Sequence, residues 1–245
     1  MLDWLKAAAA LTAVVTLGGA GAYTNAVPRT ALAHIKSIGL IVSVGDTCMF
    51  EHTKPSALEW AAPPEASFLE ISDWQIDDHV AQEVTTLLAA RFQIQVVPFE
   101  HQAFDNWTYA QLSRRIREMP EPDEPVDAYL VILRDWRPDV LGPSRQEVGG
   151  LGLYRRGNSR PNLFASYRIA LLDAQDGRLI ATRPALSPSG DTPASLAPFG
   201  TWPRTQNELS VAQGEILKTG LTSLVDQTLV STLNQLLPGA AVHTK

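Results

Sequence analysis

The sequence predicts an α/β (α+β) fold built on a mixed parallel and antiparallel sheet. Over the first half of the chain, short runs of β-branched and aliphatic residues alternate with segments of helical periodicity. A series of extended segments follows, and a long helical pattern closes the chain. The predicted order is therefore strand, helix, strand, helix, strand, two or three further strands and a terminal helix.

The first half is expected to alternate strands and helices. Residues 35–46 are rich in β-branched side chains and end in a Gly-Asp turn, which favours a central buried strand. Residues 47–76 contain three prolines and no helical period, so we predict a long surface loop. A helix over residues 77–91, capped by one of the two aspartates at its start, then precedes a strand over residues 94–99.

The second half begins with a shorter helix capped by Asn106, and a strand over residues 128–136 follows it. This helix is expected to point three side chains inward, Tyr109, Leu112 and Ile116. Extended segments at residues 146–154 and 163–173 come next. An Asp-Gly turn after the second of them indicates an antiparallel hairpin with residues 178–183.

The last quarter of the chain contains a loop and a helix. Residues 184–207 are rich in proline, serine and glycine, and are predicted to form a second long loop. Residues 208–237 have helical periodicity and are followed by Pro-Gly, which is typical of a helix end. Two glycines within this segment leave open whether the helix is bent or split.

The N-terminal residues have the layout of an export signal. Lys6 precedes an apolar stretch over residues 7–22, and small residues that fit a processing site lie at its end. The stretch is shorter than the roughly 20 residues that span a bilayer, and an uncleaved membrane tether is the alternative. We expect residues 1–26 to be a signal peptide or anchor. Residues 27–245 are then a single domain in the periplasm or on the periplasmic face of the inner membrane.

Composition and missing motifs exclude several functions. The chain has 20 basic and 26 acidic residues, a formal charge of −6, and no long basic run, which argues against nucleic-acid binding. The single cysteine, Cys48, allows neither an intramolecular disulfide nor a cysteine-based metal site. The glycines of residues 149–152 lack dinucleotide-binding spacing, and no G-x-S-x-G motif occurs. We therefore predict no cofactor and no catalytic residue.

Four phrases resemble a known layout: IGLIVSVGD, LLAARFQIQVVPF, VDAYLVILRDW and YRIALLDAQDGRLIATR. Their order behind a signal sequence is similar to that of the TolB N-terminal domain and the CsgG periplasmic domain, over most of residues 35–236. A first strand ending in Gly-Asp, then a loop and an aspartate-led helix, also resembles uncharacterised exported bacterial proteins. The resemblance implies an envelope assembly or adaptor module, although the two long loops depart from the compact pattern.

Aromatic side chains in the two predicted loops are candidates for protein binding, because exposed tryptophans anchor many interfaces. The alternative is that they cover the core. The glycine-rich strand at residues 149–152 could also pair with a strand of a partner. The candidate residues are Trp60, Trp74, Phe199, Trp202 and Tyr154. We expect a non-enzymatic envelope module that binds an unidentified protein.

A metal- or thiol-dependent hydrolase is the rival hypothesis. Glu51-His52 follows the first predicted strand and Glu100-His101 the second, so parallel pairing would bring both to the carboxyl edge of the sheet. Imidazole and carboxylate groups suit zinc or a non-haem metal, but the spacing matches no metal motif, and solvated loop residues are the alternative. The weak candidates for metal ligands are Asp46, Glu51, His52 and His101.

Overall fold

The computed structural model describes residues 26–53, 65–99, 107–120, 122, 124–138, 147–156, 161–185 and 209–239. The leader up to residue 25 and nearly all of the predicted loop at residues 184–207 lie outside these ranges. In the described part of the chain, no helix is both long and apolar enough to cross a membrane.

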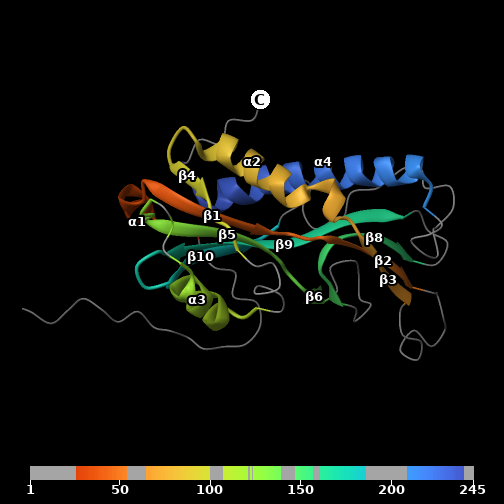
Figure 1. The fold of residues 1–245 in the computed structure, drawn as a ribbon, viewed down its shortest axis with the longest axis horizontal. Coiled ribbons are helices and arrows are strands. Elements are labelled where there is room, and N and C mark those ends of the chain that lie inside the picture. Colours follow the sequence, from red (N-terminus) through yellow and green to blue (C-terminus); the bar gives the residue numbers. More distant parts are fainter. Residues whose placement is uncertain are drawn as a thin grey trace, which may run out of the picture.

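The architecture is a mixed α/β fold, as predicted (Figure 1). The helices are α1 (Arg29–His34), α2 (Ile76–Leu88), α3 (Tyr109–Glu118) and α4 (Val211–Leu236), with a 3-10 turn at Ser72–Trp74. The strands of the main sheet are β1 (Ser37–Ser43), β2 (Thr47–Thr53), β3 (Glu65–Glu70), β4 (Gln93–Val96), β5 (Ala128–Arg134), β8 (Gly150–Arg156), β9 (Asn162–Asp173) and β10 (Leu179–Pro184). A separate two-stranded ribbon pairs β6 (Arg137–Pro138) with β7 (Glu147–Val148).

The sheet order is β3-β2-β8-β9-β5-β1-β4, and β10 pairs with β9. Strand β1 is parallel to both β4 and β5, which confirms the predicted β-α-β-α-β unit. Strand β9 is antiparallel to β5, β8 and β10. The expected hairpin at the Asp-Gly turn is therefore present.

At two places in the sheet, two strands lie end to end along one line instead of side by side. We call such a line a strand position. Only three residues separate the end of β1 from the start of β2, and Figure 1 shows the two strands nearly in line. Strand β5 ends at Arg134, opposite Tyr167 of β9, and β8 begins at Gly150, opposite Ser166. Since Tyr167 and Ser166 are adjacent, β5 and β8 occupy the same strand position one after the other. The chain leaves this position after Arg134 and returns to it at Gly150, and we call the residues between these two the excursion. We call this junction the strand break.

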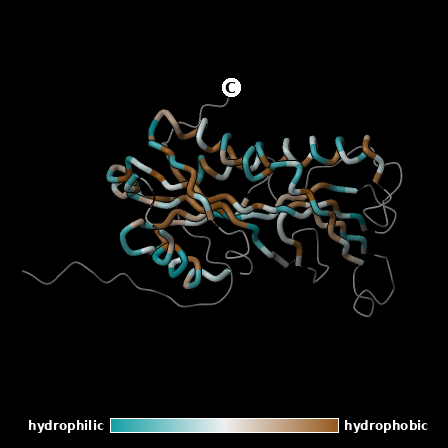
Figure 2. Tube along the Cα trace, in the orientation of Figure 1, coloured by the Kyte–Doolittle hydropathy of each residue, from teal (hydrophilic) through white to brown (hydrophobic). Residues whose placement is uncertain are grey.

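Helices α2 and α4 cover one face of the sheet, and α3 packs on the other (Figure 1). The main core lies under α2 and α4, and it includes Leu40 and Ile132, both fully buried. A second cluster joins Leu112 and Ile116 of α3 to alternate residues of β1 and β5. Figure 2 shows the hydrophobic residues concentrated between these layers. Successive residues of a strand point to opposite faces of the sheet, so strands that are covered on both faces carry apolar side chains for both clusters.

The two ends of the described fold meet. The backbone N–H of Val27 donates to the carbonyl of Leu236 at the end of α4, at 2.9 Å. Val27 is 1% exposed and belongs to the main core. The end of the last helix therefore lies against the first residues that the structure describes.

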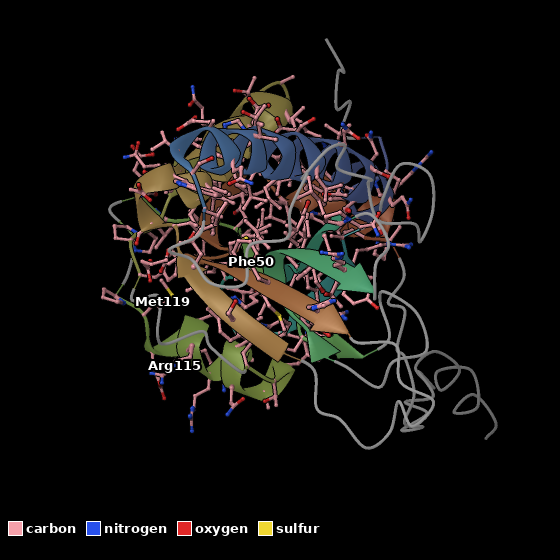
Figure 3. The ribbon with its side chains drawn as sticks, turned by 90° about the vertical axis from the view of Figure 1, so that its right-hand side faces the viewer. Phe50, Arg115 and Met119 are labelled. Atoms are coloured by element: carbon pink, nitrogen blue, oxygen red, sulfur yellow. The ribbon has the colours of Figure 1, made fainter. Side chains whose placement is uncertain are left out.

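The prediction of a loop over residues 47–76 was wrong for the described part of that segment. Strands β2 and β3 form an antiparallel hairpin there. Cys48 and Phe50 face the main core, while Met49 belongs to a smaller cluster on the opposite face. Figure 3 shows Phe50 in the layer below α4. The three prolines, on which the prediction rested, all fall in residues 54–64, outside the described ranges.

The predicted helix caps also differ from the observed ones. Helix α2 begins one residue before Asp77, and the carboxylate of Asp77 accepts hydrogen bonds from the backbone N–H groups of Val44 and Gly45 at 2.8 and 3.3 Å. Asp77 thus ties α2 to the end of β1. Helix α3 is capped by Thr108 through a reciprocal box with Gln111, not by Asn106. Helix α4 is a single uninterrupted helix.

Candidate binding cleft at the strand break

Of the five aromatic residues predicted to bind a partner, the structure describes two, Tyr154 and Trp74. Tyr154 is 4% exposed and packs in the smaller cluster with Met49. Trp74 is half-buried and packs on the main core. Both residues therefore pack on buried apolar clusters. Trp60, Phe199 and Trp202 lie outside the described residues.

The predicted glycine-rich strand edge is not available to a partner strand. Residues 150–154 pair with β9 on one side, and residues 151–156 pair with β2 on the other. A strand with neighbours on both sides has no free backbone groups to offer. The expectation of strand addition at this position was therefore wrong.

Three of the four candidate metal ligands, Asp46, Glu51 and His52, lie in the described part of the chain. Glu51 and His52 lie within β2, not after the end of a strand, and adjacent strand residues point to opposite faces. Strand β4, which precedes the segment containing His101, pairs with β1 and not with β2. His101 itself is outside the described residues. No group of three or more potential ligands occurs among the residues that the structure describes, Asp46 included.

Glu51 is instead a fully buried carboxyl group, and neither of its oxygens has a hydrogen-bond partner. Desolvation by burial raises its pKa from 4.5 to about 7. Its register neighbour on β8 is Tyr154. Burial likewise raises the pKa of the Cys48 thiol, which keeps the sulfur protonated and unreactive. Cys48 and Glu51 are thus both buried, and burial favours the uncharged form of each.

A cleft of about 460 Å³ opens at the strand break, on the face of the sheet that α3 covers. Three segments line it: residues 107–109 at the start of α3, residues 134–136 at the end of β5, and Arg168 of β9. We call this site the aromatic cleft, because three of its lining side chains are Trp107, Tyr109 and Trp136. Tyr109 and Trp136 are 36% and 37% exposed, although Tyr109 was predicted to point inward.

The aromatic side chains are held in place by specific contacts. The indole N–H of Trp107 donates to the carbonyl of Arg134 at 3.2 Å. Trp107 and Tyr109 contact edge to face, with ring centroids 5.4 Å apart and an interplanar angle of 74°. The ring of Trp136 lies against Gly149, where a Cβ atom would come within 2.6 Å of the indole. Glycine at this position therefore permits the close approach of Trp136 to the strand.

The polar side chains of the cleft are anchored to β9. Arg168 donates to the Asp135 carboxylate at 2.9 Å and to the hydroxyl oxygen of Tyr109 at 3.2 Å. Burial disfavours the charged form of Arg168, but the hydrogen bond and the charge of Asp135 outweigh it and raise the arginine pKa. The hydroxyl of Ser166 donates to the Asp135 carbonyl at 2.7 Å. These contacts hold Asp135, the first residue of the excursion, in place.

Arg134 is the second arginine of the cleft. Its Nε is buried and has no hydrogen-bond partner among the residues that the structure describes. The side chain runs along the strand break, where a Cβ on Gly150 would lie 2.9 Å from Nε and a Cβ on Gly45 would lie 3.0 Å from a terminal nitrogen. Among the described residues that line the cleft, Arg134 and Arg168 are basic and Asp135 is acidic, and the Asp135 carboxylate binds Arg168.

A larger cavity, of about 630 Å³, lies beside α1 and the turn before β10, but its acidic groups serve the fold. Asp127 accepts hydrogen bonds from the backbone N–H groups of Lys36 and Ser37 at 2.7 and 3.0 Å. These bonds lower the pKa of Asp127. Asp173 accepts from the backbone N–H groups of the following turn. The aromatic cleft is the stronger candidate for a binding site, because its aromatic side chains are partly exposed.

The sequence contained signals for the cleft that our prediction did not use. Trp107 and Tyr109 lie two positions apart at a helix start, and Trp136 directly follows the charged pair Arg134-Asp135 at a strand end. Arg168 lies within a predicted strand among apolar residues, which is unusual for a buried segment. Only the sheet register, however, brings these segments together.

No protein-family model matches the sequence, and no curated protein matches it. Protein XCC0632 from Xanthomonas campestris, of the DUF330 family, is 14% identical over 80% of this chain and 85% of that one, with a TM-score of 0.34. Hypothetical protein CT253 from Chlamydia trachomatis is 12% identical over 80% of this chain and 99% of that one, with a TM-score of 0.24. The chain is thus similar to uncharacterised bacterial proteins, as expected. TolB and CsgG are not among these structures, and scores this low support no conclusion about function.

Proposed function

We propose that this protein is a non-enzymatic module of the bacterial cell envelope, and that it binds another protein at the aromatic cleft. The observation that carries the proposal is the grouping of Trp107, Tyr109 and Trp136 with arginines around one cleft. Tryptophan, tyrosine and arginine are the residues most enriched at the energetic centres of protein interfaces. A partner segment placed here would contact all of them at once.

The cleft is also organised before a partner arrives. The hydrogen bond of Trp107, its contact with Tyr109 and the packing of Trp136 on Gly149 restrict the three rings. Little side-chain entropy is then lost on association, which favours binding. Thr108 provides the only hydroxyl among the lining residues besides that of Tyr109, and it is occupied as the helix cap. The lining therefore suits recognition better than nucleophilic chemistry.

Export is the second part of the proposal, and it rests on the N-terminal sequence. The apolar stretch at residues 7–22 with small residues at its end fits a cleaved leader. Val27 is buried in the main core, so processing before this residue would leave the fold complete. Intact-mass analysis of protein recovered from the periplasm tests this part. A start near Tyr23 or Val27 is expected, whereas recovery from the cytoplasm with Met1 retained would contradict export.

The binding site is tested with Trp136→Ala and the matched control Phe68→Ala. Phe68 is a similarly exposed aromatic, at 50%, on the edge strand β3 and outside the cleft. A photo-reactive side chain in place of Tyr109 should crosslink a defined envelope protein, identified by mass spectrometry. Trp136→Ala should weaken that association by about 2 kcal/mol or more, as removal of an interface anchor does. The proposal fails if Phe68→Ala has the same effect, or if crosslinking does not depend on Trp136.

A further inference from the structure

The aromatic cleft has the size of a site for a short peptide segment. Its volume of about 460 Å³ lies within the range of about 300–1,000 Å³ that is typical of small-ligand sites. A folded domain cannot enter a space of this size, but a few residues of an extended chain can. Three of the side chains that line it are the aromatic rings of Trp107, Tyr109 and Trp136. The cleft therefore suits a short, largely apolar segment.

Several hydrogen-bond acceptors of the cleft are already engaged within the fold. The carbonyl of Arg134 accepts from the Trp107 indole N–H at 3.2 Å, and the carbonyl of Asp135 accepts from the Ser166 hydroxyl at 2.7 Å. The Asp135 carboxylate accepts from Arg168 at 2.9 Å. A ligand that brings many N–H donors would find these acceptors occupied.

Two partly exposed aromatic side chains of the cleft have a hydrogen to donate. The indole nitrogen of Trp136 is a donor and never an acceptor. The hydroxyl oxygen of Tyr109 accepts from Arg168 at 3.2 Å, which leaves the hydroxyl hydrogen for another acceptor. The cleft thus combines apolar ring surface with donors, and it selects a ligand that is apolar and rich in acceptors.

A proline-rich segment has this combination of properties. Proline has no backbone N–H, so each proline adds a carbonyl acceptor without adding a donor that needs a partner. In the polyproline II conformation the backbone makes no internal hydrogen bonds, and its carbonyls are exposed. Proline-rich chains populate this conformation before they bind, so little entropy is lost when they dock on aromatic side chains.

From this arrangement, and resting on the proposed function, we infer that the partner protein inserts a proline-rich segment in the polyproline II conformation into the aromatic cleft. Its proline rings pack on Trp107 and Trp136. Its carbonyls accept from the indole N–H of Trp136 and from the hydroxyl of Tyr109.

The spacing of prolines favours a partner over this chain as the source of the segment. Polyproline II has three residues per turn, so prolines share one face when they lie three positions apart. In the two proline-rich segments of this chain, residues 55–64 and 184–203, no two prolines have that spacing. The partner is therefore expected to carry a P-x-x-P sequence.

The test uses three peptides, blocked at both ends, as probes of the full chain. The first, Pro-Pro-Ala-Pro-Pro-Ala-Pro, has prolines three positions apart, and in the second every proline is replaced by alanine. The third has the sequence of residues 192–203 of this chain. Binding is followed by NMR through the indole N–H signals of the protein, which are assigned with Trp107→Phe and Trp136→Phe.

The first peptide is expected to bind about tenfold more tightly than either of the others, because its prolines preset the bound conformation. It should also shift the indole signal of Trp136, whose N–H gains an acceptor. Trp136→Phe keeps an aromatic ring but loses the donor, and should weaken binding about three- to tenfold, the contribution of one hydrogen bond. Phe68→Ala, on β3 and outside the cleft, should leave binding unchanged. Added salt should have little effect, because no charge pair is formed.

Three outcomes would overturn the inference: equal binding of the proline and alanine peptides, no binding of any peptide, or full affinity in a folded Trp136→Phe variant. Tighter binding of the third peptide would also overturn it, because the cleft would then prefer a segment of this chain.

Failure of the inference can be told apart from failure of the proposed function. If crosslinking at Tyr109 depends on Trp136 but the proline peptide does not bind, the partner inserts a segment of another chemistry and the proposed function stands. If crosslinking does not depend on Trp136, both proposals fail.

Discussion

Arg168 of β9 binds the carboxylate of Asp135 at 2.9 Å, and so connects the first residue of the excursion to the strand opposite. Both side chains are largely buried, with 18% and 13% of their surfaces exposed. The pair lies beside the point where β5 stops and β8 begins. It therefore stabilises the strand break and one wall of the aromatic cleft together.

Removing one member of this pair is expected to destabilise the fold. Arg168→Met leaves the Asp135 carboxylate without its cation, and we expect the free energy of unfolding to fall by about 1–3 kcal/mol, less than for a fully buried pair. Urea denaturation measures the change. In the double variant Asp135→Asn with Arg168→Met, part of the loss should be recovered, because no unpaired charge remains. Strictly additive losses would show that the two residues do not interact.

The second prediction concerns Glu51 and pH. The fold raises the pKa of this carboxyl from 4.5 to about 7, so the folded state disfavours the ionised form. In the unfolded chain the Glu51 carboxyl is hydrated and its pKa returns to the ordinary value. The stability contribution is therefore fully present below pH 4.5 and is lost as the pH rises towards 7.

Glu51→Gln should flatten this pH dependence, and at pH 8 it should remove a destabilisation on the order of 2 kcal/mol. Thermal denaturation between pH 4.5 and 8 measures both effects. Glu215→Gln is the control, since Glu215 is an exposed residue of α4. If both variants retain the wild-type pH profile, the buried carboxyl is not the source of the dependence.

The third prediction compares two glycines. A Cβ on Gly152 would lie 2.2 Å from the ring of Phe164 and 2.3 Å from the Met49 carbonyl oxygen. Gly152→Ala should therefore destabilise the fold by about 1–3 kcal/mol through overpacking. Gly214 lies in α4 with no atom within 4 Å of such a Cβ, so Gly214→Ala should stabilise the fold by about 0.5–1 kcal/mol. Chemical denaturation should show that the two changes alter the free energy of unfolding in opposite directions. Changes in the same direction would contradict the packing described for β8.

The fourth prediction concerns the two central strands. Leu40→Asp or Ile132→Asp places a carboxylate in the core under α2 and α4, where both positions are fully buried. Either change should unfold the protein, because the charge has no partner there. Arg115→Ala should change stability by no more than about 0.5 kcal/mol. Circular dichroism of the purified variants measures the result, and folded aspartate variants would show that the core is placed wrongly.

The sequence predicted those parts of the fold whose local pattern is unambiguous. Strands β1 and β5 are runs of β-branched and aliphatic residues, and the hairpin of β9 and β10 is marked by its Asp-Gly turn. The hairpin of β2 and β3 was missed. Its charged residue Glu51 is buried by neighbours such as Tyr154 that lie about a hundred residues away in the chain. No local pattern indicates that burial.

The candidate site was harder to predict for the same reason. Three separate segments of the chain form the aromatic cleft, and they meet only because β5 and β8 share one side of β9. The prediction favoured aromatic residues in proline-rich segments, and of these the structure describes Phe68 and Trp74, neither of which lines the cleft. A tryptophan at the end of a buried strand, such as Trp136, is ordinarily expected to belong to the core.

The hydrogen bond between Val27 and Leu236 has a consequence for biogenesis. Helix α4 supplies much of the core that covers β1, so the first strand remains uncovered on that face until the last thirty or so residues have emerged. A chain that crosses a membrane from its N-terminus would therefore remain unfolded throughout transit and fold only after its C-terminal helix arrives. During that interval, apolar strands are exposed to aggregation, and a chaperone that holds the chain would raise the yield of folded protein.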